Sequence, residues 1–182
     1  ITAFEDIHAN VVWPAPGSST DDISSTFGPR IKLTCSCYDF HRGVDIHGVI
    51  SDDVVASYGG KVKRKMVLGG GGLTLILEHS FADWTKLHEE GPSTNKWYTV
   101  YMHLHDTLVD GTQVEEGDFL EAGDIIAHVG MSGSATHAHL HHEVRVGMRC
   151  SLEYALDHPS STCNTKNYDP HVHPFLVYPT GT

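Results

Sequence analysis

The segment that decides the fold is His139-Leu140-His141-His142-Glu143-Val144-Arg145-Val146. Successive side chains of a β-strand point to opposite faces, so His139, His141 and Glu143 would share one face. The opposite face is apolar except for His142, which indicates that it covers a hydrophobic core. We therefore predict a strand that presents two imidazoles on its open face, with their Cα atoms about 7 Å apart.

Runs with the same alternation recur along the chain, separated by glycine-rich or polar turns. They are Val54–Tyr58, Gly60–Met66, Leu73–His79, Trp97–Leu104 and Asp124–Val129. Short strands at this spacing are typical of a β-dominated domain. We predict an all-β-dominated fold with an antiparallel sheet core, long active-site loops and little helix.

Length and composition fit one globular domain. The chain has 182 residues and 40% of them are apolar, which is about the size and character of a single domain. We expect one domain over residues 1–182, with an irregular N-terminal arm (about 1–26) and a C-terminal tail (about 148–182) tied to the body by cysteines. Trp13 and Phe27 are expected to anchor the N-terminal end by packing.

A further histidine lies on the predicted strand that contains Val100-Tyr101-Met102-His103-Leu104. Alternation places Tyr101 and His103 on the polar face of this strand, opposite three apolar side chains. Taken alone, the pattern is more typical of a surface histidine than of a site residue. His103 becomes a candidate site residue because other residue types that bind metals occur elsewhere in the chain.

One such set is His41-Arg42-Gly43-Val44-Asp45-Ile46. Positions four apart on a straight strand lie roughly 13 Å apart, too far to share a metal. Gly43 would let the chain bend between His41 and Asp45. Asp45 also lies between two apolar residues, and a buried carboxylate is costly without a partner. A metal ion would be that partner.

Two histidines and one aspartate form a donor set that suits zinc. His41, Asp45 and a histidine of the H-x-H pair would leave the fourth position to water, as in catalytic sites, and the bound water would have a pKa of about 7. The chain has no H-E-x-x-H, so the usual glutamate base is missing and a histidine must serve. We expect one zinc ion per chain.

These motifs resemble the lysostaphin-like endopeptidases, peptidase family M23, which share an H-x3-D and an H-x-H signature. The matching segments, spread over about residues 11–147, are His41-x3-Asp45, His139-x-His141, Tyr101-Met102-His103-Leu104, Gly130-Met131-Ser132-Gly133-Ser134, Glu116-Gly117-Asp118, Ala122-Gly123-Asp124-Ile125-Ile126 and Phe27-Gly28-Pro29-Arg30. The resemblance implies that His41, Asp45 and His141 bind zinc. It also implies that His103 and His139 are catalytic.

The same resemblance implies a substrate and leaves one alternative. Family members cut peptide bonds in bacterial peptidoglycan, so we expect a zinc metalloendopeptidase acting on Gly- or D-Ala-containing cross-links or stem peptides. The alternative is a non-catalytic zinc-binding module of the same fold, with a regulatory or signalling role. A biotinyl or lipoyl carrier shares the hairpin pattern, but Lys65 lies in the wrong order along the chain for the modified lysine.

The chain departs from the family pattern at two histidines. His137 stands where the family usually has a glycine, so the turn before the active strand could be reshaped. His142 stands where the family usually has an aromatic residue. It lies on the predicted core face, so its ring needs a hydrogen-bond partner.

Net charge limits the possible partners. The formal charge is −11 with neutral histidine, which argues against nucleic acid or an anionic lipid surface. No apolar run approaches the ~20 residues that span a bilayer. We therefore expect no nucleic acid and no membrane as partner. The resemblance implies a cell-wall peptide as the partner, and we expect a monomer.

The four cysteines are Cys35, Cys37, Cys150 and Cys163, an even set that permits two disulfides. A bridge between the first two would close a small, strained ring. We therefore expect bridges from both to the two tail cysteines; a thiolate zinc site is the alternative, but the usual spacing is missing. Disulfides indicate an oxidising compartment, so we expect a secreted protein. The chain begins at Ile1 without a signal peptide, consistent with a processed or trimmed form.

Overall fold

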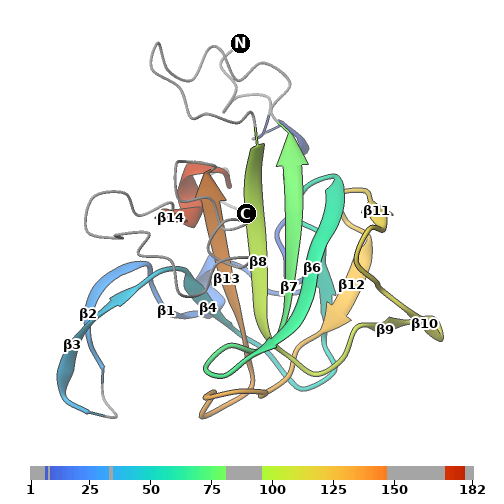
Figure 1. The fold of residues 1–182 in the computed structure, drawn as a ribbon. Helices are drawn as coiled ribbons and strands as arrows, with labels where there is room; N and C mark the ends of the chain where they lie inside the picture. Colours follow the sequence, from blue (N-terminus) through green and yellow to red (C-terminus); the bar gives the residue numbers. More distant parts are fainter. Residues whose placement is uncertain (1–6, 8, 33–34, 81–95, 147–170, 179–182) are drawn as a thin grey trace, which may run out of the picture.

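A large antiparallel sheet forms the centre of the molecule (Figure 1). The computed structural model describes residues 7, 9–32, 35–80, 96–146 and 171–178. In spatial order the sheet contains β1 (Ile23–Ser25), β4 (Val44–His47), β13 (His139–Val146), β8 (Lys96–Leu104), β7 (Gly72–Ser80), β6 (Gly60–Leu68) and β11 (Phe119–Leu120), and β14 (His171–Val172) also pairs with β13. Every strand pair is antiparallel, as predicted.

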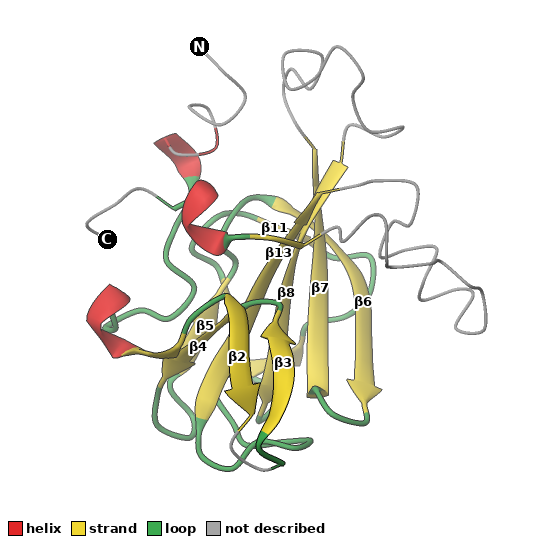
Figure 2. Cartoon of the chain, turned by 90° about the vertical axis from the view of Figure 1, so that its left-hand side faces the viewer, coloured by secondary structure: helices red, strands yellow, loops and turns green. Residues whose placement is uncertain are grey.

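Three two-stranded ribbons complete the described fold. They are β2 (Gly28–Lys32) with β3 (Cys37–His41), β5 (Asp53–Val55) with β12 (Ile125–His128), and β9 (Leu108–Val109) with β10 (Thr112–Gln113). Among the described residues, helix is confined to short turns such as η1 (Thr20–Asp22) and η3 (Pro174–Leu176), and strands dominate the view in Figure 2. The predicted fold class is therefore confirmed. Within the described ranges, no helix combines the length and apolar character needed to cross a membrane.

The main core lies on the inner face of the large sheet, where the β5–β12 ribbon contributes to it. Alternate residues of the sheet strands point inward, and the ribbon adds small and branched side chains. Among the fully buried members are Val44, Val54, Leu75, Leu77, Tyr101, Ile126, Leu140 and Val144. On β13 this is the face predicted to be apolar, so His139 and His141 on the opposite face are available for the site.

Both ends of the described chain pack on this core. Trp13 is 9% exposed, and its ring meets that of Tyr178 edge to face at 5.2 Å. Phe27 is partly buried against the core, so both predicted anchors pack as expected. The N-terminal arm is less irregular than predicted, because residues 23–25 form β1 and pair with β4. This pairing covers the edge of the sheet beside the site.

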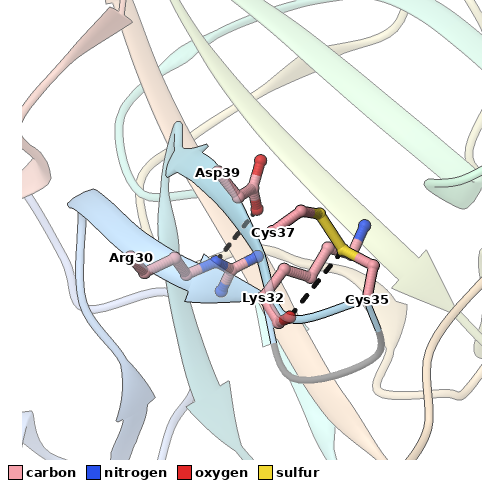
Figure 3. Close-up of a disulfide and its surroundings, with 5 residues drawn as sticks. All are labelled: Arg30, Lys32, Cys35, Cys37 and Asp39. Carbon is pink, nitrogen blue, oxygen red and sulfur yellow. Dashed lines mark hydrogen bonds and ion pairs between the residues drawn. A yellow bond between two sulfur atoms is a disulfide. The ribbon is translucent and has the colours of Figure 1, made fainter.

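The predicted cysteine pairing is wrong for the first two cysteines. Cys35 forms a disulfide with Cys37, as Figure 3 shows. A tight turn makes this possible, because Ser36 has a φ of 49° and the two Cα atoms lie 5.1 Å apart, within the usual range for a bridge. Cys150 and Cys163 lie outside the described residues. The bridge closes the turn of the β2–β3 ribbon, whose last residue is His41.

Candidate metal centre and active site

Strand pairing brings the predicted site residues together. In the register between β4 and β13, Asp45 lies opposite His141 and His47 opposite His139. His41 reaches the same place from the end of β3. Strand pairing thus brings the two motifs, which are far apart along the chain, into contact. The histidines of H-x-H and the His and Asp of H-x3-D lie together on the outer face of the sheet.

Gly43 permits this approach for a reason that differs from the prediction. We expected glycine's backbone freedom to supply a bend, but Gly43 is not among the residues with positive φ. Instead, a Cβ at this position would collide with the carbonyl oxygen of His142 and lie 2.9 Å from Cγ of Glu143. The absence of a side chain is therefore what lets the 41–45 segment lie against β13.

His41, Asp45 and His141 form a compact triangle of potential ligands. Asp45 Oδ1 lies 3.2 Å from His41 Nε2 and 2.7 Å from His141 Nδ1, and the two nitrogens are 3.1 Å apart. A tetrahedral zinc with bonds of about 2.1 Å holds its ligand atoms roughly 3.4 Å apart. The triangle is close to one face of such a tetrahedron, so these residues could hold a metal ion.

Hydrogen bonds on the far side of each ring select the ligand atoms. His41 Nδ1 lies 2.9 Å from the carbonyl oxygen of Thr26, which can only accept, so this nitrogen carries the proton. His141 Nε2 lies 3.1 Å from a carboxylate oxygen of Glu143. In the neutral form that metal binding requires, the lone pairs therefore lie on His41 Nε2 and His141 Nδ1, which both face Asp45.

Electrostatics show that the triangle favours positive charge. Burial would raise the pKa of Asp45, but hydrogen bonds to His141 and His41 and their charges lower it far below the usual 3.8. Burial would lower the pKa of His141, but Asp45 and Glu143 raise it to about 9. The carboxylates thus stabilise a cationic charge at this point, which is a property that a metal-binding site needs.

Two more histidines lie beside the triangle without belonging to it. The ring centroids of His103 and His139 are 4.7 Å apart, and His103 lies 6.1 Å from the ring of His141. His139 Nε2 is 3.6 Å from Asp45 Oδ1. All five predicted site residues are therefore gathered in one place.

The two flanking histidines are held in the same tautomer. His103 Nδ1 donates to the carbonyl oxygen of Ser132 at 2.8 Å, and His139 Nδ1 donates to the carbonyl oxygen of His137 at 2.9 Å. Each ring therefore keeps its lone pair on Nε2. Burial lowers the pKa of both side chains below 6.5, partly opposed by these backbone hydrogen bonds. Both are thus suited to accept a proton near neutral pH.

A β-bulge explains how His103 reaches the site. The regular alternation of β8 places Met102 on the outer face, opposite His141, and turns Tyr101 into the core, where it is fully buried. The prediction that Tyr101 shares the polar face with His103 is therefore wrong. The register with β7 shifts between Leu73 and Leu75, and His103 adopts a φ of 61°. This break returns His103 to the outer face.

The two unusual histidines have different environments. His142 is fully buried and lies 2.7 Å from the hydroxyl of Tyr178, so the expected partner is present. Burial lowers the pKa of His142 to about 3, which keeps the ring neutral. His137 is exposed, and its ring lies 4.9 Å from that of His139. Only His137 borders the site.

Sequence reasoning missed the residues that support the ligands. Glu143 lies two residues after His141 on the same strand face, so the alternation of β13 could have indicated its contact with His141. Arg30 had no such signal, because its contacts depend on how the β2–β3 ribbon lies. Its Nη1 donates to Ser25 Oγ at 2.6 Å and lies 3.5 Å from Asp45 Oδ2. Arg30 therefore contacts the oxygen of Asp45 that points away from the triangle.

The sheet, the triangle of two histidines and an aspartate, and the two flanking histidines define a metallopeptidase type of site. The model of Peptidase family M23 matches residues 39–153, which include all five site residues. The chain belongs to peptidase family M23.

Individual relatives agree with this assignment. The chain is 29% identical over 124 residues to the DD-carboxypeptidase/endopeptidase Mpg of Neisseria meningitidis serogroup B, covering 68% of this chain and 24% of that protein. It is similar to a zinc-containing peptidase from Vibrio cholerae (TM-score 0.57, 26% identity, 74% of this chain and 36% of that chain). It is also similar to the catalytic domain of lysostaphin from Staphylococcus simulans (TM-score 0.54, 25% identity, 84% and 90%). The chain spans about a quarter of the length of the Mpg proteins that it matches.

Proposed function

We propose that this chain is a secreted zinc metalloendopeptidase that hydrolyses peptide bonds in bacterial peptidoglycan, at Gly- or D-Ala-containing cross-links or stem peptides. We propose that it acts as a monomer, with residues 1–182 as one catalytic domain. The observation that carries the proposal is the pair of neutral imidazoles, His103 and His139, beside a triangle of zinc-type ligands.

His41, Asp45 and His141 would hold one zinc ion through Nε2, Oδ1 and Nδ1. When bound, zinc supplies a Lewis acid that polarises the scissile carbonyl and acidifies a water molecule. The donor set fits this metal because imidazole and carboxylate are common zinc ligands and three of them leave a coordination position open.

The flanking histidines provide the proton transfers. His139 Nε2 carries a lone pair and lies 3.6 Å from Asp45 Oδ1, so it can take a proton from a water molecule that attacks the substrate. His103, after taking up a proton from solvent on Nε2, can stabilise the oxyanion or give that proton to the leaving amine. A purely metal-binding module would have no need for two neutral bases next to the ligands.

The substrate class rests on the relatives. The similarity to a DD-carboxypeptidase/endopeptidase and to the catalytic domain of the antimicrobial peptidase lysostaphin favours cell-wall peptides. Secretion rests on the disulfide between Cys35 and Cys37, which favours an oxidising compartment.

The test is digestion of purified peptidoglycans that differ in cross-bridge chemistry, with new termini identified by mass spectrometry. We expect new amino termini next to Gly or D-Ala with the wild-type protein and far fewer with His139→Ala. The matched control is His105→Ala, because this histidine is 53% exposed and has no contact with the ligand triangle among the described interactions. Absence of cleavage in every wall, together with cleavage of an unrelated protein, would overturn the substrate assignment.

A further inference from the structure

The side chain of Glu143 lies directly behind the metal ligand His141, on the same face of β13. Its Oε1 is 3.1 Å from His141 Nε2, on the opposite side of the imidazole from the ligand triangle. Glu143 is 3% exposed, so water contributes little to its solvation. A carboxylate buried in this way requires fixed partners.

Arg145 is the second partner of Glu143. Its Nε donates to Oε2 of Glu143 at 2.7 Å, and its Nη2 also contacts this oxygen. The two carboxylate oxygens therefore have separate tasks, because Oε1 faces His141 and Oε2 faces Arg145. The three side chains alternate along one strand face at positions 141, 143 and 145, so they form a continuous polar line that ends at the ligand triangle.

We propose that Glu143, held by Arg145, is the positioning residue that makes His141 a metal ligand through Nδ1. The inference rests on the proposed function, since it requires zinc at His41, Asp45 and His141. When Asp45 Oδ1 and His141 Nδ1 both face the metal ion, the one proton of the neutral imidazole stays on Nε2 beside Glu143, and the lone pair lies on Nδ1. The hydrogen bond from Nε2 to Glu143 fixes the ring plane and increases the basicity of the ligand nitrogen.

Two features distinguish this arrangement from an ordinary structural ion pair. An ion pair between Glu143 and Arg145 that served stability alone would not need His141 as a third member. Here one oxygen of Glu143 contacts the ligand histidine. His41 has no carboxylate in the corresponding position, because its Nδ1 donates to the backbone carbonyl of Thr26. Glu143 therefore contacts one ligand, His141. Its removal should weaken metal binding while the protein remains folded.

The experiment measures the zinc dissociation constant of the full chain by competition with a chelator. The variants are Glu143→Gln, which removes the charge, and Glu143→Asp, which keeps the charge but shortens the side chain. The matched control is Glu78→Gln on β7, because Glu78 is also a shielded carboxylate, ion-paired with Lys96 at 2.7 Å and with Lys63 at 3.4 Å. Thermal unfolding of each zinc-free protein checks that the variants are folded.

We expect Glu143→Gln to bind zinc about 10- to 100-fold more weakly than wild type, with Glu143→Asp intermediate and Glu78→Gln unchanged. The visible absorption spectrum of bound Co²⁺ should change in Glu143→Gln and stay as in wild type in Glu78→Gln. A folded Glu143→Gln protein with wild-type zinc affinity would overturn the inference.

Two other results would also count against it. If Glu143→Gln does not fold, Glu143→Asp decides, and wild-type zinc affinity in that variant overturns the inference. An equal loss of affinity in Glu78→Gln would show that the effect is general destabilisation. Failure of the wild-type chain to bind zinc is a distinct result, since it removes the proposed function itself and the inference with it.

Discussion

His103 and His139 face each other across two neighbouring strands, with their ring centroids 4.7 Å apart. Their Nδ1 atoms donate to the backbone carbonyls of Ser132 and His137 respectively. Both rings therefore present Nε2 as a base, next to His141 but outside the ligand triangle. This relationship separates residues that bind the metal from residues that move protons.

The first prediction concerns that division of roles. Replacing either His103 or His139 with alanine should reduce turnover at least about 100-fold, because general acid–base catalysis and oxyanion stabilisation each contribute on this scale. Zinc content should remain as in wild type, since neither ring belongs to the triangle. The measurement pairs metal analysis with kinetics. Loss of zinc from either variant would make that residue a ligand, and full activity of both would contradict their catalytic roles.

The second prediction concerns pH. Burial lowers the pKa of His139 below the ordinary 6.5, and the neutral form of this ring is the proposed base. A lowered pKa keeps the ring neutral at more acid pH, so the acid limb of kcat/KM should be centred below pH 6.5. The profile must be recorded with zinc content measured at each pH. An acid limb centred at pH 7 or above, with zinc fully bound, would contradict the lowered pKa.

The third prediction tests the buried contact between His142 and Tyr178. Tyr178→Phe removes a hydroxyl that lies 2.7 Å from His142 Nε2 and 2.6 Å from Ser57 Oγ. Buried polar atoms left without a partner cost roughly 1–3 kcal/mol, so the free energy of unfolding should decrease by about that amount. Tyr38→Phe is the matched control, because Tyr38 is 72% exposed. Equal stability of the two variants in urea unfolding would show that the contact contributes nothing.

The fourth prediction uses Gly43. An alanine there would place Cβ against the carbonyl oxygen of His142, so the 41–45 segment must move away from β13. Zinc affinity should decrease, because this movement separates His41 and Asp45 from His141. Gly69→Ala is the control, since a Cβ at Gly69 meets nothing within 4 Å. Isothermal titration with zinc distinguishes the two, and equal affinities would show that the close approach is not required.

Much of the fold and site could be predicted from the sequence because period-two alternation is a local signal. It placed β13 with its bounds at 139–146 and assigned its apolar face to the core. It failed on Tyr101, because the bulge at His103 depends on pairing with β7 and alternation cannot show it. The disulfide between Cys35 and Cys37 was missed because the turn at Ser36 adopts a positive φ.

The residues that contact the ligands were harder to predict, because some of these contacts also depend on how distant segments pack together. Glu143 lies two residues from His141 on one face, so local spacing contained the contact. Arg30 reaches Asp45 only because the β2–β3 ribbon lies beside β4, and no spacing along the chain encodes that distance. Resemblance to a family supplied the choice of His141 rather than His139 as the ligand, and the shorter distance of His141 from Asp45 agrees with it.

The central claim is that His41, Asp45 and His141 hold one zinc ion. The most direct measurement is the zinc content of the purified wild-type chain and of Asp45→Ala, after dialysis against a metal-free buffer. We expect about one zinc per chain in wild type and almost none in Asp45→Ala, because three ligands leave little redundancy. Asp53→Ala, which alters an aspartate that is 49% exposed, should retain zinc. Full zinc occupancy in Asp45→Ala would contradict the account.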